Sequence, residues 1–487
     1  DRSVSRGLGD VYKRQVMGGF NAEHQNVRTL SAQRDGIIVP DLPTIDTSTE
    51  QDVAGGGYNH WATAGFFGRL NYNYKEKYLL EVNGRYDGTS RFMKDQRWNF
   101  FPSFSLGWNV ARENFWKPLE SVVNQFKLRG SWGELGNQNT SNLYPFYEIL
   151  PVKSNSGNWL VNGGKTNTAD IPSLVSTLLT WERVRSFNVG FDFGAFSNRL
   201  TGSFDYFVRK TVDMVGPAPQ LPLVLGIAPA IVNNADMKSY GFEIELSWRD
   251  RIGEVDYGVK FNLADAQQKV VKYPNTTNAF NDWYAGKMSG EIWGYTSLGI
   301  AKTDEEMKEH LASLPNGGQN QLGNKWGAGD IMYADINGDG KVDGGKGTLA
   351  DPGDQRIIGN STPRYNFGLV LDASYKGFDV SIFFQGVGKR DYAPIVGTNG
   401  AVFWGAVNNI WQSMAMEEHF DYFRPEGHPM GANLNGYYPR PDFTSNKNHQ
   451  VQTRYLQDAS YIRLKNLQIG YTSVSYTHLR AHETLSD

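Results

Sequence analysis

The sequence predicts an all-β protein, specifically a transmembrane antiparallel β-barrel with long extracellular loops. Two observations carry this prediction. Apolar and polar residues alternate with a period of two over segments of roughly 9–12 residues, which is the length that crosses a bilayer at a tilt. Short and long connections also alternate along the chain, as they do between the two ends of a bacterial barrel.

The alternating segments place aromatic and aliphatic side chains on one face of each expected strand. Phe187, Val189 and Phe191, for example, oppose Asn188 and Asp192. Strands in soluble sandwiches also alternate, but they average only about 5–6 residues. Rows rich in Tyr, Phe and Trp suit the membrane interface, and the charged rows suit a wet lumen. The clearest segments are 66–74, 78–87, 103–110, 186–193, 242–249, 365–372 and 378–385.

The connections predict which end of the barrel faces the periplasm. Short turns are expected at 75–77, 197–198, 251–252 and 376–377, with a longer connection and space for a short helix at 112–125. Long connections are expected at 88–100, 135–183, 210–239, 265–363 and 389–460. Short periplasmic turns and long extracellular loops are typical of bacterial barrels. The pattern predicts roughly a dozen strands, a little over half of a large barrel.

Composition excludes several other classes. The 487 residues carry a net charge of −3, which argues against a general nucleic-acid binder. The absence of cysteine excludes disulfides, zinc–cysteine sites and thiol catalysis. No run approaches the 18 apolar residues of a transmembrane helix, whereas a mean hydropathy of −0.49 is compatible with strands that are apolar on one face.

The residues at both ends of the chain have a pattern that indicates an artefact of sequencing or assembly. Residues 10–15 (DVYKRQ) and 474–479 (VSYTHL) are encodable by the two strands of one transposase mosaic-end sequence. We therefore expect residues 1–15 and 474–487 to be foreign to the fold and residues 16–473 to be a partial barrel.

Several stretches together resemble the SusC/RagA-type TonB-dependent outer-membrane transporters. They occur in the order of that family across almost all of the chain, and only their combination is specific. The stretches are Gly68–Phe92, Arg97–Phe115, Leu128–Gln138, Leu179–Phe193, Gly290–Ile300, Asp335–Asp343 and Ser460–Tyr471.

The resemblance implies a fragment of a 22-stranded barrel with a plugged lumen in the outer membrane of a Gram-negative bacterium of the Bacteroidota. It implies energised import of oligosaccharides or peptides, driven by the TonB–ExbB–ExbD complex, and a SusD-like surface lipoprotein as a lid. The plug and the TonB-contacting segment would precede residue 16, and the last strands would follow Tyr471. Outer-membrane lipid would surround the barrel, and no nucleic acid is expected.

One loop has the spacing of a calcium site. Oxygen donors at its first, third and fifth positions, glycine at the sixth and a main-chain carbonyl at the seventh are typical of calcium loops. Lys346 stands where the final acidic ligand is usual, and the matching aspartate lies beyond the intervening residues 344–353. An Asx-rich turn without metal is the alternative. The candidate ligands for a structural Ca²⁺ are Asp335, Asn337, Asp339, Lys341, Asp343 and Asp354.

Aromatic residues of the long loops are the candidates for substrate contact, because aromatic faces stack on sugar rings. The candidates are Trp283, Tyr284, Trp404 and Trp411. The alternative is that these side chains pack the loops together and fill the barrel mouth. Trp293, inside the family-like stretch, is expected to be structural.

Catalysis has little support, because the sequence contains no G-x-S-x-G elbow, H-E-x-x-H helix or Walker loop. Glu243 and Glu245 could mimic a glycosidase pair, but similar carboxylates recur on other strands and suit a lumen. Import is therefore the leading hypothesis. A passive porin or surface adhesin is the second, and a secreted, calcium-bound, all-β glycan-active enzyme is the third.

Overall fold

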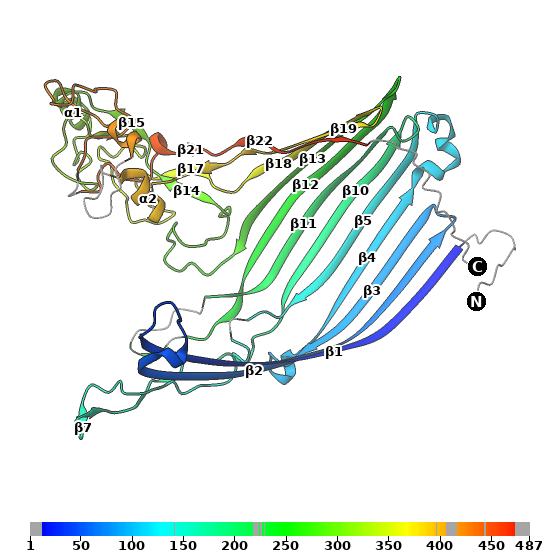
Figure 1. Cartoon of the computed structure of the whole chain (residues 1–487), viewed down its shortest axis with the longest axis horizontal. Helices are drawn as coiled ribbons and strands as arrows, with labels where there is room; N and C mark the ends of the chain where they lie inside the picture. The colour runs from blue at the N-terminus through cyan, green and yellow to red at the C-terminus, as the bar shows by residue number, and fades with distance from the viewer. Residues whose placement is uncertain are drawn as a thin grey trace, which may run out of the picture.

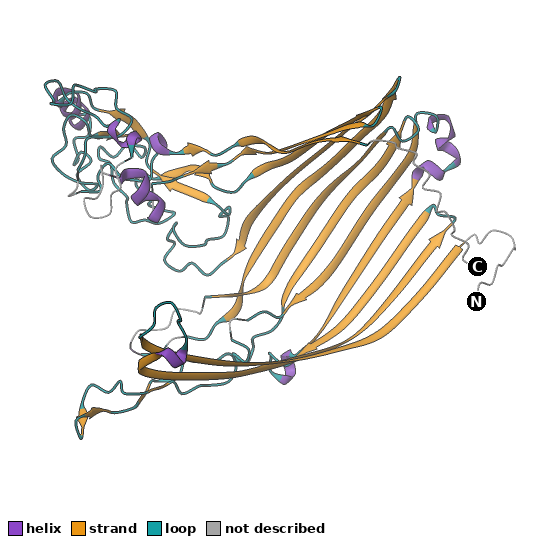
Figure 2. Cartoon of the chain, in the orientation of Figure 1, coloured by secondary structure: helices purple, strands orange, loops and turns teal. Residues whose placement is uncertain are grey.

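The structure is a computed structural model, and it describes residues 12–140, 142–217, 224, 226–227, 229–395, 397–405, 416–442 and 445–472. Strands dominate the described chain, and the few helices lie in connections between strands (Figure 2). No helix in these ranges is long and apolar enough to cross a membrane.

One antiparallel sheet of twelve strands forms the body of the molecule, with β1 and β22 at its edges (Figure 1). Each strand pairs with its neighbours in chain order, as in an up-and-down barrel, so the predicted fold class is confirmed. The strands are β1 (Tyr12–Ile37), β2 (Ser48–Tyr74), β3 (Tyr78–Thr89), β4 (Trp98–Asn109), β5 (Val123–Asn137), β10 (Glu182–Ala195), β11 (Leu200–Gly216), β12 (Val232–Ile252), β13 (Val255–Lys272), β18 (Arg364–Tyr375), β19 (Phe378–Lys389) and β22 (Tyr461–Tyr471).

The connections alternate between short turns and long loops, as predicted. The turn expected at 251–252 instead lies at 253–254, because Ile252 still pairs with Val255. Lys75 and Glu76 form a tight turn in which both have a φ of 54°, a conformation that matches the twist of a hairpin. The Asn73 side chain supports it by accepting a hydrogen bond of 2.9 Å from the Glu76 backbone N–H. The expected short helix between β4 and β5 is present as two 3₁₀ turns, Val110–Arg112 and Asn114–Leu119.

Strands run further toward the loop end than the sequence pattern predicted. The pairing of β1 with β2 continues to Ile37 and Ser48, whereas β3 leaves β2 at Thr63. This projecting hairpin lacks the apolar alternation of a membrane strand, and side-chain contacts such as the 3.0 Å hydrogen bond from Tyr58 to Asn26 join its two strands besides the backbone ladder. The predicted boundary at residue 16 remains a prediction; residues 12–15 pair with β2, and residues 1–11 and 474–487 lie outside the described ranges.

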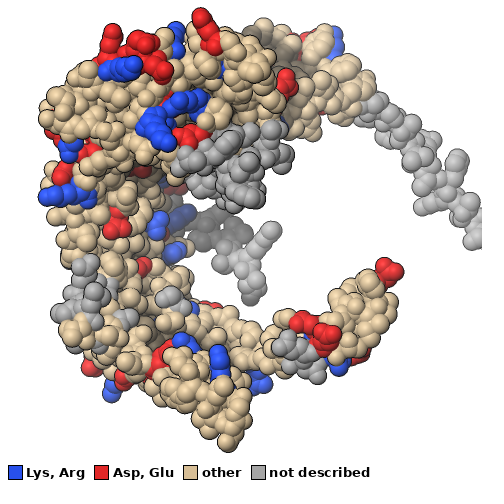
Figure 3. All heavy atoms as spheres, turned by 90° about the vertical axis from the view of Figure 1, so that its left-hand side faces the viewer, with Lys and Arg blue, Asp and Glu red and all other residues tan. Residues whose placement is uncertain are grey.

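The two faces of the sheet differ in chemistry. The convex face carries the apolar rows, and large side chains such as Leu106 (64% exposed) lie on its surface. The concave face carries polar side chains, and the space-filling view from the loop end shows the wall curving around an open trough (Figure 3). An apolar outside and a polar inside are the arrangement of a membrane barrel rather than of a soluble sandwich.

Aromatic pairs mark the turn end of the convex face. The rings of Trp116 and Phe126 stack with centroids 5.2 Å apart, and those of Tyr74 and Tyr78 lie 6.3 Å apart. Near the other end, Tyr86 stacks on Trp98 at 5.2 Å. Tyr and Trp prefer the membrane–water interface, so these pairs fit the two girdles of a barrel.

Short elements build the loops. In the described parts of the loops, five two-stranded ladders lie outside the main sheet: β6 (Val152–Lys153) with β9 (Thr168–Ala169), β7 (Leu160–Val161) with β8 (Gly164–Lys165), β14 (Glu291–Gly294) with β17 (Arg356–Asn360), β15 (Ser297–Ile300) with β16 (Ile331–Tyr333), and β20 (Asp391–Tyr392) with β21 (Gln457–Asp458). The helices are α1 (Asp304–Ala312) and α2 (Gly397–Trp404), and further 3₁₀ turns are Ile45–Thr47, Lys94–Gln96, Glu417–Phe420 and Thr453–Tyr455.

The assignment of faces makes a prediction for β11. Phe204 faces outward and Ser203 inward, where its cross-strand neighbours are Asp192 and Glu245. We expect Phe204→Arg to destabilise the full-length barrel in lipid vesicles by about 2–4 kcal/mol, because arginine is costly at the lipid face. Ser203→Arg is the matched control and should change stability by less than about 1 kcal/mol, since two carboxylates flank it. Urea unfolding measures both, and equal losses would contradict the assignment.

Candidate functional site: the lumen wall and the loop module

The concave wall near the turn end carries a network of charges. Arg129 of β5 donates through Nη2 to Asp192 of β10 and to Asp205 of β11, each at 2.8 Å. A recess of about 470 Å³ lies beside this network. Most of the residues that line it are polar, and they come from β1 to β11, including Glu81, Ser105 and Asn188.

Two long connections fold together into one compact unit beyond the loop end of the sheet. We call this unit the loop module and define it as the described parts of residues 273–363 and 389–460. Its core is a cluster of buried apolar and aromatic side chains contributed by both connections. The core residues are Tyr295, Leu314, Ile331, Tyr333 and Val342 from the first, and Ile395, Trp404, Tyr438 and Tyr455 from the second.

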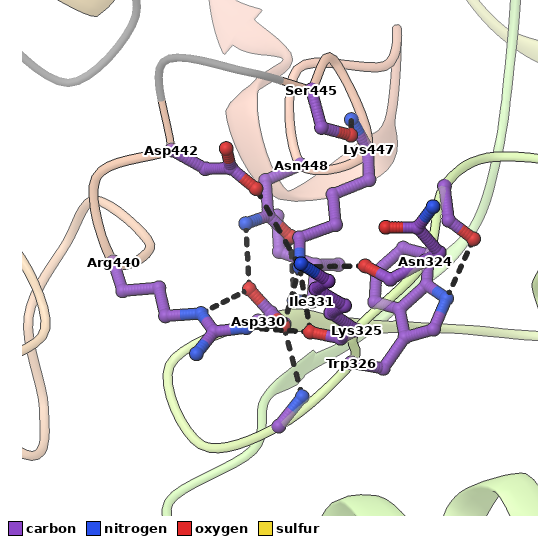
Figure 4. A network of polar contacts seen from close by, with 12 residues as sticks. Asn324, Lys325, Trp326, Asp330, Ile331, Arg440, Asp442, Ser445, Lys447 and Asn448 are labelled. Atoms are coloured by element: carbon purple, nitrogen blue, oxygen red, sulfur yellow. Dashed lines mark hydrogen bonds and ion pairs between the residues drawn. The ribbon is translucent and has the colours of Figure 1, made fainter.

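A buried ionic cluster fastens the two connections (Figure 4). Asp330 is fully buried, and its carboxylate accepts hydrogen bonds from Arg440 at 2.6 and 2.7 Å. Lys447, itself only 1% exposed, donates through Nζ to the same carboxylate at 2.9 Å. Asn448 adds a bond of 3.0 Å to Asp330. Residues more than 100 positions apart thus meet at one carboxylate.

This cluster was missed by the sequence reasoning. Asp330, Arg440 and Lys447 show no local spacing that points to one another, because their contact depends on how two separate connections fold.

The predicted calcium loop folds into a tight turn around its own carboxylates. Asp335 accepts hydrogen bonds from the backbone N–H groups of Gly338 at 2.7 Å and Gly340 at 2.8 Å. Asp354 returns to this loop across the ten intervening residues 344–353 and is fully buried. Its carboxylate accepts from the backbone N–H of Ile336 at 2.7 Å and of Asp343 at 2.8 Å.

The pKa values of two carboxyl groups in this loop are shifted in opposite directions. Burial raises the pKa of Asp354 above its usual value, and the negative charge of Asp335 adds to the rise. Lys341 Nζ lies 2.5 Å from a carboxylate oxygen of Asp343 and 3.9 Å from one of Asp339. The hydrogen bond from Lys341 is the main reason that the pKa of Asp343 is lowered.

The donor set of the loop is all oxygen, which is the chemistry that Ca²⁺ prefers. The arrangement itself is held by hydrogen bonds, with Lys341 supplying a positive charge. Among the described residues, no group of three or more His, Cys, Asp or Glu side chains gathers in the manner of a metal site. The structure brings the six predicted residues into one loop but does not turn their side chains toward a common point.

Trp283 and Tyr284 lie in a loop stabilised by Lys287. The Lys287 ammonium group donates to the carbonyl oxygens of Phe280 and Asp282 at 2.8 Å each. Tyr284 is nearly buried, and its hydroxyl donates to Glu291 at 2.6 Å; burial, with this carboxylate, raises the pKa of Tyr284 to about 12. Trp283 is 40% exposed.

Trp404 has a different role from Trp283. It is 1% exposed and packs in the core of the loop module, with ring centroids 4.9 Å from Tyr455 and 4.4 Å from His449. The alternative, that loop aromatics pack the loops together, describes this residue. Trp411 lies outside the described residues. Trp293 stacks on Phe280 at 4.6 Å, a packing contact.

The sheet with its apolar outside, its charged concave wall and its folded loops defines the class of protein, an outer-membrane β-barrel. The profile of the family described as "TonB dependent receptor-like, beta-barrel" matches residues 3–481. The chain therefore belongs to the TonB-dependent receptor β-barrel family, whose members reside in the outer membrane.

Particular relatives support the SusC/RagA type. TonB-dependent receptor P3 of Formosa agariphila is 30% identical over 423 residues, covering 83% of this chain and 38% of that relative. TonB-dependent receptor SusC of Bacteroides thetaiotaomicron is 24% identical over 422 residues, covering 84% and 37%. The solved structure of the RagAB peptide transporter superposes with a TM-score of 0.72 at 19% identity, covering 95% of this chain and 47% of that chain.

These matches confirm the resemblance expected from the sequence. The chain spans less than half the length of each of these three proteins. The relatives are named as receptors and transporters rather than enzymes, which is consistent with the sequence prediction.

The ionic cluster of the loop module makes a prediction. We expect Asp330→Asn to destabilise the module by about 3–5 kcal/mol, because Arg440 and the buried Lys447 lose their shared counter-charge. Hydrogen exchange of the full-length protein measures the loss, which should be confined to residues 273–363 and 389–460. Asp170→Asn is the control, since its ion pair with Lys153 is exposed and should contribute no more than about 1 kcal/mol. Unchanged protection in Asp330→Asn would contradict the role of the cluster.

Proposed function

We propose that the full-length protein imports nutrients across the outer membrane, energised by TonB, as the barrel of a SusCD-type complex. The observation that carries the proposal is the combination of a charged lumen wall with a folded loop module at the barrel mouth. The membership of the family and the likeness to SusC support it. A passive pore does not require a folded loop module at its extracellular end.

Oligosaccharides are the proposed cargo, and peptides are the second candidate. Trp283 supports the first, because an exposed aromatic face held by a braced loop suits stacking on a sugar ring. The charged concave wall and the fold shared with the RagAB peptide transporter favour the second. We keep Tyr284 as a neighbour that positions Trp283 rather than as a second stacking surface.

A SusD-like surface lipoprotein and the TonB–ExbB–ExbD complex are the proposed partners. The likeness to SusC and to a two-component transporter supports the first, and membership of a TonB-dependent family supports the second. The passive porin or adhesin and the secreted glycan-active enzyme remain the competing hypotheses. The enzyme hypothesis requires a water-soluble protein, which the apolar convex face disfavours.

Uptake by cells tests the proposal. A strain that lacks the gene should regain uptake of a labelled oligosaccharide when the full-length protein returns, and a protonophore should abolish that uptake. Trp283→Ala should weaken binding of the oligosaccharide about three- to tenfold, because one aromatic contact is lost. Phe115→Ala, an exposed aromatic at the turn end, is the control. Uptake that survives the protonophore would indicate a passive pore, and competition by unlabelled peptides alone would indicate a peptide importer.

We also propose that the aspartate loop binds a structural Ca²⁺ that braces the loop module. The oxygen donors and the buried Asp354 beside Asp335 support this, since a cation there would offset two negative charges. Binding requires Lys341 to leave Asp343. The ion would have no catalytic role.

Calorimetric titration of the full-length protein with Ca²⁺ tests this site. We expect binding heat and a stabilisation of the module of about 2.7 kcal/mol when free Ca²⁺ is about 100 times its Kd. Asp335→Asn should weaken both effects, whereas Asp95→Asn, in an exposed turn, should not. No heat together with melting that is insensitive to a chelator would show that the loop is a metal-free Asx turn.

A further inference from the structure

A row of basic residues crosses the convex face near its loop end. Arg185 of β10 is the direct cross-strand partner of Lys210 of β11, which is the partner of Lys238 of β12. Lys238 is in turn the partner of Lys269 of β13. Neighbouring strands lie about 4.8 Å apart, so this basic row spans about 14 Å.

On β10, β11 and β12 the outward position next to the basic row is aromatic or apolar, whereas on β13 the outward residues Asp265 and Gln267 separate Lys269 from the apolar band. On β11 the outward positions between Leu200 and Val208 are apolar or glycine, and eight residues at a tilt of about 40° rise by about 20 Å. The next outward position is Lys210. Beyond it the ladder loses its regular register, with shifts at Thr211/Met214 and at Asp236/Met237. The row therefore occupies the height of lipid headgroups on the loop side.

The electrostatics of the row are unfavourable within the protein alone. Like charges directly opposite one another destabilise a sheet. Arg185 has a counter-charge, because it donates to Glu134 at 2.6 Å. Lys238 lies with Nζ 5.1 Å from the centre of the Tyr240 ring. In the described part of the chain, no carboxylate forms an ion pair with Lys210, Lys238 or Lys269.

We propose that this row is a binding site for the phosphate of a phosphorylated glycolipid in the outer leaflet. Three ammonium groups on one line can surround one phosphate, while the acyl chains lie along the apolar side chains below. The proposal rests on the outer-membrane placement of the proposed function and adds a specific lipid contact to it. A protein partner is a weaker occupant, because a lid over the barrel mouth would not reach an outward-facing row at the membrane surface.

Native mass spectrometry of the full-length protein in nanodiscs tests the site, with monophosphoryl lipid A and its dephosphorylated form as probes. We expect selective retention of the phosphorylated form. The triple variant Lys210→Gln, Lys238→Gln, Lys269→Gln should weaken that binding on the order of 100-fold, since each basic residue near an anionic membrane surface contributes a factor of about five. The control is Lys75→Gln, Lys117→Gln, Lys165→Gln, which removes the same charge from exposed positions elsewhere.

The outcomes separate this site from the transport function. Equal binding of both probes, or equal loss in the two triple variants, would overturn the lipid site while leaving uptake untouched. If the triple variant of the row loses a co-purifying lipoprotein but still binds lipid A, the lipid site is also overturned, and the row is assigned to a protein partner. If the full-length protein is not found in the outer-membrane fraction of cells, the transport function itself is refuted. Retained heat-modifiable migration shows that the variants fold.

Discussion

Backbone N–H and C=O groups that cross a hydrocarbon layer have no water to bond, so each must find its partner within the sheet. That constraint explains the continuous ladder from β1 to β22 and the near-perfect register of its central strands. It also divides every strand into two chemistries, because successive side chains alternate between lipid and lumen. Arg129 and Phe191 can therefore lie on neighbouring strands in opposite environments.

The same constraint determines where irregular structure is allowed. At the turn end, connections such as Lys75–Lys77 are minimal and leave no room for a site. At the other end, loops project into water and must supply their own stability. The loop module does so with a core around Tyr333 and Tyr455 and with a buried carboxylate, Asp330, shared by two cations. It resembles a small domain built from two insertions, which suits a mouth that must hold its shape.

The aspartate loop and the basic row show two treatments of concentrated charge. In the loop, backbone N–H groups and Lys341 compensate carboxylates such as Asp335 and Asp343. In the row, Lys210 and Lys269 face outward with no ion-pairing carboxylate among the described residues. The contacts within the aspartate loop explain how that loop folds. Uncompensated like charges at headgroup height indicate a ligand outside the chain.

The sequence by itself determined the strands, their two faces and the end that carries long loops, because period-two alternation and turn residues are local properties. It also identified Asp335 to Asp354 as one candidate loop and Trp283 as a loop aromatic. Only the tertiary structure decided that Asp354 returns to the loop, that Trp404 is buried and that Asp330 joins Arg440 and Lys447. The basic row likewise required strand register, since its members are separated in the chain by more than twenty residues and meet only across the sheet. Contacts between residues far apart in the sequence depend on how the long connections fold and how the strands align, and a local sequence pattern does not contain that information.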